Sequence, residues 1–62
     1  MSKTMNHAEY PASLKAKSSD SLRFIIADCR EALKGWPNHP NAGYYLDEIS
    51  YCGMELVKRG EA

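Results

Sequence analysis

Hydrophobic residues in the middle of the chain recur with the spacing of one helical face. They lie three and four residues apart at Leu22, Ile25, Ile26, Cys29, Ala32 and Leu33, a pattern typical of one side of a helix. The polar cluster at 18–21 offers N-caps, and Pro37 after Gly35 forbids continuation. The sequence therefore predicts a first helix over about residues 19–34.

A second amphipathic pattern follows a short connection, WPNHPN at 36–41, that is rich in proline and asparagine. Its expected core positions are Tyr45, Ile49, Cys52 and Leu56, with Ala42, Leu46, Gly53 and Val57 on one shoulder. Glu55 and Arg59 are spaced as an i, i+4 ion pair, and Gly60 ends the pattern. We expect a second helix over about 41–59 and, because no stretch alternates with period two, no sheet.

These elements predict an all-α fold, an antiparallel helical hairpin with an N-terminal arm or short helix packed on it. The arm is 1–17, where Pro11 can open a short helical turn, and the hairpin domain is 18–60. The expected core consists of Leu22, Ile26, Leu33, Tyr45, Ile49 and Leu56.

Several aromatic residues lie away from both core stripes. Phe24 points away from the core line of the first helix, and Tyr44 and Tyr51 share a second face of the other. Two readings stay open. Either the arm covers this face through Tyr10 and Leu14, or the face binds another protein through Phe24, Trp36, Tyr44, Tyr51 and Met54. A third outcome is a homodimer, because chains below about 70 residues gain little stability from one core and two hairpins would form a four-helix bundle.

Charge and composition narrow the function classes. Eight Lys and Arg balance eight Asp and Glu, which makes nucleic acid an unfavourable partner. The longest apolar run is Phe24–Ala27, so no membrane span is expected, and the polar N-terminus carries no export signal, which favours the cytoplasm. There Cys29 and Cys52 are expected to be free thiols, with Cys29 facing Leu46 about 9 Å along the axis from Cys52.

No chemical constellation stands out in the sequence. The four residues that prefer zinc, His7, Cys29, His39 and Cys52, are isolated rather than paired. Asp47 and Glu48 are adjacent on a helix and point about 100° apart, so they do not close on one substrate. We therefore expect no cofactor, no metal and no enzymatic activity.

Two family resemblances can be read from the residues. The stretch from Glu31 to Leu46, with Pro37, Ala42 and Tyr44, resembles the junction between two tetratricopeptide repeats, but the 34-residue period of that family is missing. The segments LRFIIADCREAL (22–33) and AGYYLDEISYCGMEL (42–56) resemble small uncharacterised proteins of tailed bacteriophages. The second resemblance implies a protein that binds and inhibits a host or defence protein.

The first functional expectation is thus a small protein-binding module, a phage-encoded inhibitor or modulator. The alternative is an oligomeric small-molecule or nucleotide binder. In it, Tyr10, Tyr44 or Trp36 would stack on a base while Lys15, Lys17 or Arg23 meets phosphate.

Overall fold

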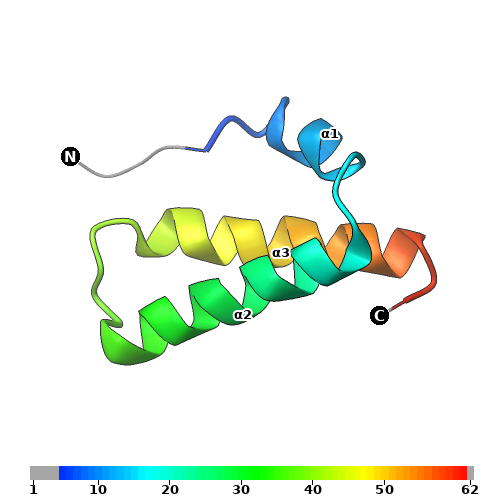
Figure 1. The fold of residues 1–62 in the computed structure, drawn as a ribbon. Helices are drawn as coiled ribbons and strands as arrows, with labels where there is room; N and C mark the ends of the chain where they lie inside the picture. The colour runs from blue at the N-terminus through cyan, green and yellow to red at the C-terminus, as the bar shows by residue number, and fades with distance from the viewer. Residues whose placement is uncertain (1–4, 62) are drawn as a thin grey trace.

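The protein folds as three helices, described over residues 5–61 of a computed structural model. They are α1 (Tyr10–Leu14), α2 (Ser19–Gly35) and α3 (Ala42–Lys58). Figure 1 shows α2 and α3 side by side and antiparallel, joined by the loop at one end, while the arm with α1 lies along α3. The all-α class, the hairpin and the packed N-terminal segment are confirmed, with helix ends within one residue of those predicted.

Both long helices end as their sequences dictate. Ser18 accepts a hydrogen bond from the Ser21 N–H at 3.1 Å and so caps α2. At the same end of the hairpin, where α3 stops, Gly60 has φ +74°, its N–H donates to the Val57 carbonyl, and the Glu61 N–H donates to the Leu56 carbonyl. This is a Schellman motif, which needs the left-handed conformation that glycine adopts at no steric cost.

The core lies where all three helices meet. Leu14, Leu22, Cys52 and Leu56 form one buried cluster, and Met5 and Cys29 are also buried. Of the six predicted core residues, Leu22 and Leu56 are buried and Ile26 packs against the cluster. The other three, Leu33, Tyr45 and Ile49, are only half-buried. One reason is that α1 packs on α3, so that its Leu14 joins Leu22, Cys52 and Leu56 in the buried cluster.

Arg59 fastens the connection between α1 and α2 to the end of α3. Its guanidinium donates to the carbonyls of Leu14 (3.2 Å) and Lys17 (2.7 Å) and to the Ser19 hydroxyl (3.1 Å). It also forms the predicted pair with Glu55, at 3.0 Å. These contacts hold the start of the hairpin in place.

Over residues 5–61, no helix is both long enough and apolar enough to cross a bilayer.

Candidate partner-binding surfaces

The arm covers the aromatic face of α3. The Tyr10 ring lies 6.3 Å from that of Tyr44 and 6.0 Å from that of Tyr51, and His7 Nδ1 is hydrogen-bonded to the Tyr51 hydroxyl at 2.8 Å. Tyr44 and Tyr51 are consequently half-buried. Of the readings left open by the sequence, the one in which the arm folds over this face describes the structure, so these two tyrosines are not part of an open partner surface.

A polar cluster lies beneath the arm. The Tyr10 hydroxyl donates to Glu48 Oε2 at 2.8 Å and lies 3.9 Å from Cys52 Sγ. Burial, with the Glu48 carboxylate as a further cause, raises the pKa of Tyr10 and raises the pKa of Cys29 to about 12. Burial also raises the pKa of Cys52.

Both cysteines are free. Cys29 is buried, whereas Leu46, the residue it was expected to face, is exposed. Since thiolate is the nucleophilic form, thiols with a raised pKa are poor nucleophiles at neutral pH. The cluster therefore fixes the arm to the hairpin and does not activate a cysteine.

Trp36 forms an exposed aromatic edge at the loop end of the hairpin. Its side chain is 54% exposed. One edge contacts His39 at 4.4 Å between ring centroids, and His39 in turn lies 5.1 Å from the Tyr45 ring. The His39 Nδ1 also accepts the Asn41 N–H at 2.9 Å. This hydrogen bond and the ring contacts hold His39, and with it Trp36, in a defined position before α3 begins.

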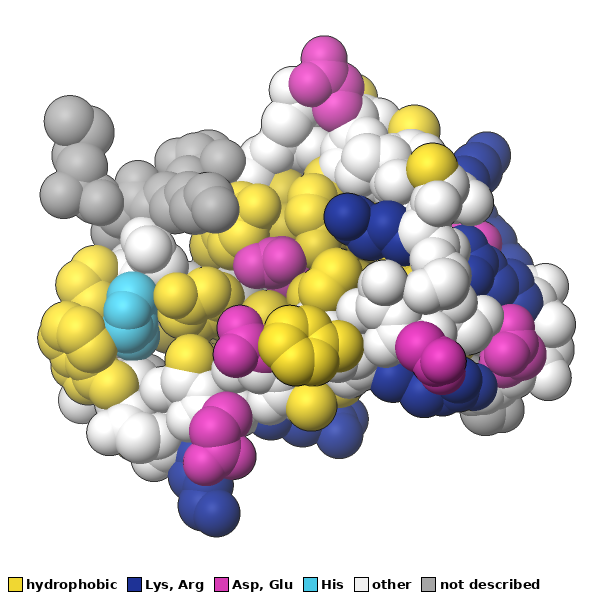
Figure 2. All heavy atoms as spheres, viewed as in Figure 1, with side chains coloured by type: hydrophobic (Ala, Val, Ile, Leu, Met, Phe, Trp, Pro, Cys, Tyr) yellow, Lys and Arg dark blue, Asp and Glu magenta, His cyan; other side chains and the backbone are white. Residues whose placement is uncertain are grey.

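Phe24 is the most exposed of the large hydrophobic residues, at 70%, and lies on the solvent side of α2. Figure 2 shows that hydrophobic side chains appear on one face of the molecule both over the middle of α2 and at the loop end. Acidic side chains lie between and beside them. Phe24 and Trp36 are thus the aromatic residues from the predicted partner set that remain open to solvent.

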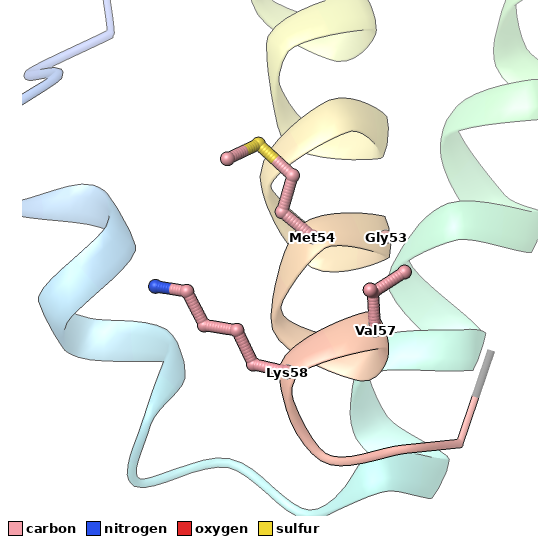
Figure 3. A pocket seen from close by; sticks show the side chains of 4 residues that line it. All are labelled: Gly53, Met54, Val57 and Lys58. Atoms are coloured by element: carbon pink, nitrogen blue, oxygen red, sulfur yellow. The ribbon is translucent and has the colours of Figure 1, made fainter.

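Met54 belongs to a different surface, on the outward side of α3. A shallow depression of about 500 Å³ is lined there by Gly53, Met54, Val57 and Lys58. In Figure 3, Met54 and Lys58 extend toward the α1 side of α3 and Val57 extends toward the α2 side. The helix surface at Gly53, which has no side chain, is left uncovered between them. A Cβ built on Gly53 would meet nothing within 4 Å.

Leu46, 57% exposed, extends this surface beyond Val57, which is 65% exposed. The sequence pattern predicted that both lie on the shoulder of the core, which is wrong, because the buried residues of α3 are Cys52 and Leu56. A signal did exist in the sequence. Apart from Lys58 at its edge, the residues on this side of α3 are uncharged, which is unusual for a helix face in water.

The five predicted partner residues thus divide among three places. Tyr44 and Tyr51 lie under the arm, Phe24 and Trp36 are exposed on α2 and at its end, and Met54 is exposed on α3. They do not form one continuous surface. The contacts do not support a dimer through Phe24, Tyr44 and Tyr51 together, because the arm covers Tyr44 and Tyr51.

Among residues 5–61, no three His, Cys, Asp or Glu side chains converge closely enough to hold a metal ion. Comparisons of the chain with protein-family models, with curated proteins and with solved structures found no match. The resemblances to a tetratricopeptide-repeat junction and to phage proteins therefore remain predictions.

Proposed function

We propose that this protein is a small protein-binding module that acts by inhibiting or modulating another protein. The observation that supports it is the exposure of two large aromatic side chains, Phe24 and Trp36, on a chain of 62 residues. Burying a large apolar side chain is worth about 1.5 to 3 kcal/mol. Burying these two exposed side chains against a partner would therefore contribute substantially to the free energy of binding.

The placement of the two aromatic residues suits a single interface. They are twelve residues apart on or just after α2, which corresponds to about 18 Å along the helix axis. A standard protein interface covers about 800 Å² on each partner, roughly 30 Å across, and is dominated by a few aromatic and arginine anchors. Because His39 holds Trp36 in place, binding would cost little side-chain entropy at that anchor.

The nucleotide-binding alternative gains no support from the contacts. Two of its stacking residues, Tyr10 and Tyr44, already pack against each other. Arg23, its candidate phosphate ligand, pairs with Asp20 at 3.3 Å and with Glu61 at 3.5 Å. A non-enzymatic role in the cytoplasm, against a host or defence protein, is part of the proposal. It rests on the sequence pattern alone.

The proposal is tested by affinity capture from a bacterial lysate with the wild-type protein and two variants, Phe24→Ser and Trp36→Ser. Both residues are exposed, so the variants are expected to fold and to keep the circular dichroism of the wild type. Proteins captured by the wild type should be lost, by at least tenfold, with both variants.

Lys15→Ser serves as the matched control, because Lys15 is exposed and lies on the connection after α1. It should capture the same proteins as the wild type. If the aromatic variants and the control capture the same set in the same amounts, protein binding through this surface is refuted.

A further inference from the structure

The outward side of α3 carries an uncharged stripe along its whole length. The stripe consists of Gly43, Leu46, Ser50, Gly53 and Val57, which we call the uncharged face. Its residues are three and four positions apart, the heptad spacing by which one helix packs along another. All five charged residues of α3 and its C-cap lie elsewhere, at Asp47, Glu48, Glu55, Lys58 and Arg59.

Nothing within the described chain uses this face. Leu46 and Val57 are more than half exposed. A Cβ added at Gly43 or Gly53 would meet no atom within 4 Å. Glycine inside a helix costs up to about 1 kcal/mol relative to alanine, and no contact in the fold offsets this. A second helix could approach closely at the glycines and bury the exposed aliphatic side chains.

We propose that the uncharged face binds a second copy of this chain, with the two α3 helices antiparallel about a twofold axis. In this arrangement positions whose numbers add to about 103 face each other. Leu46 packs against Val57 of the partner subunit, and Ser50 packs against Gly53 of the partner subunit. Large residues then meet each other at the two ends and small ones meet at the axis, where the helices are closest.

Charge complementarity selects the antiparallel orientation. Asp47, whose carboxylate lies near His7 of the arm, and Lys58, which extends toward the α1 side in Figure 3, lie eleven residues apart along the same edge of the uncharged face. Eleven residues are close to three full turns, so their side chains point the same way. In the antiparallel pair Asp47 of each copy faces Lys58 of the other, and this happens twice by symmetry. In a parallel pair this edge of one helix would face the opposite edge of the other, so neither Asp47–Lys58 pair would form.

Both charges are available for this pairing. Lys58 is exposed and has no ion pair within residues 5–61. Asp47 lies 3.9 Å from His7 Nε2, which attracts it only when that histidine is protonated. The dimer would therefore not have to break an existing strong ion pair on either side of the interface.

The size of the face sets the strength of the association. The 17 residues of α3 extend about 25 Å, and a helix face is about 10 Å wide. That is well below the roughly 800 Å² per partner of a stable complex. A weak dimer is therefore expected, half formed at hundreds of micromolar. This contact leaves Phe24 on α2 free, so it is separate from the proposed binding of another protein.

Sedimentation equilibrium of the full chain between 10 µM and 1 mM tests the proposal. The apparent mass should rise with concentration from 7.0 kDa toward 14 kDa, twice the mass of the chain. Val57→Glu would bury a charge in the contact and should keep the mass at 7.0 kDa up to 1 mM. Phe24→Glu, a change of the same kind at an exposed site on α2, should associate like the wild type.

The charge pairs give an independent readout of orientation. Asp47→Lys should weaken association roughly tenfold, because two attractive pairs become repulsive. The double variant Asp47→Lys with Lys58→Asp should restore it. A wild-type mass that stays at 7.0 kDa at 1 mM, equal effects of Val57→Glu and Phe24→Glu, or no rescue by the double variant would each overturn the proposal. None of these outcomes bears on capture through Phe24 and Trp36.

Discussion

Arg59 is expected to contribute more to the stability of this fold than any other charged side chain on its surface. Removing it by Arg59→Ala breaks hydrogen bonds to three carbonyls, those of Leu14, Lys15 and Lys17, and to the Ser19 hydroxyl. It also breaks the ion pair with Glu55. The carbonyls belong to the connection that holds α1 against the hairpin, so their loss loosens the arm as well as the end of α3.

The magnitude follows from the number and kind of these contacts. A hydrogen bond to a charged group contributes about 1.5 to 3 kcal/mol when buried and less when it is open to solvent. Arg59 and Glu55 are only partly buried, and the carbonyls can bind water once the side chain is gone. We therefore expect Arg59→Ala to lower the free energy of unfolding by about 2 to 3 kcal/mol. A core of this size supplies only about 3 to 5 kcal/mol in total.

Urea unfolding followed by circular dichroism at 222 nm measures this loss, at a concentration low enough to keep the chain monomeric. The matched control is Arg30→Ala, which removes the same side chain from an exposed site on α2 where no hydrogen bond or ion pair is formed within residues 5–61. It should change stability by less than about 0.5 kcal/mol. Arg59→Lys should fall between the two, because an ammonium group keeps the charge without the planar fork. Equal stabilities of Arg59→Ala and Arg30→Ala would refute the reasoning.

Three further expectations concern the core, the thiols and the side-chain carboxylate of Glu61. Leu22→Ala should lower the free energy of unfolding by about 2 to 5 kcal/mol, and Ile49→Ala by less, because Leu22 is fully buried and Ile49 is not; urea unfolding that gives the reverse order would mean the core is placed wrongly. Because the pKa of Cys29 is raised to about 12 and that of Cys52 is also raised, alkylation at pH 8 should be at least tenfold slower in the folded protein than in urea. Two labels should appear by intact mass after unreduced denaturation, and a mass two units lower without labels would instead indicate a disulfide. The hydrogen bond from Ser19, with Arg23 and Arg59 nearby, lowers the pKa of Glu61 below its usual 4.5, so the stability it adds is present above that pH and is lost as the pH falls through the folded value. Glu61→Gln should therefore reduce the loss of stability measured between pH 7 and pH 3, and an unchanged loss would contradict this role.

Local signals fixed the helices and their ends. The Ser18 cap, the Gly60 stop and the spacing of Leu22, Cys29 and Leu33 act within a few residues along the chain, and each appears in the structure where the pattern placed it. The Glu55–Arg59 pair is equally local and also formed. Such features depend on helix periodicity and backbone geometry, which one sequence displays directly.

The partner surface was less accessible from the sequence. Phe24, Trp36 and Met54 are exposed as expected, but Tyr44 and Tyr51 pack under the arm. The sequence left the position of the arm open, because a helix of five residues carries almost no periodic pattern of its own. Which flank of α3 it covers depends on contacts between residues about forty positions apart, such as Tyr10 with Glu48.

The sequence alone therefore determined the all-α hairpin, its boundaries and the residues that can face a core. Only the tertiary structure decided which of these residues are buried. The physical reason is that α3 has two neighbours, α2 and α1, on different flanks. The amphipathic pattern of α3 alone does not indicate which side of the helix stays exposed to water once both neighbours have packed against it. That side is the uncharged face of Leu46, Gly53 and Val57, and its exposure became visible only after α1 was placed.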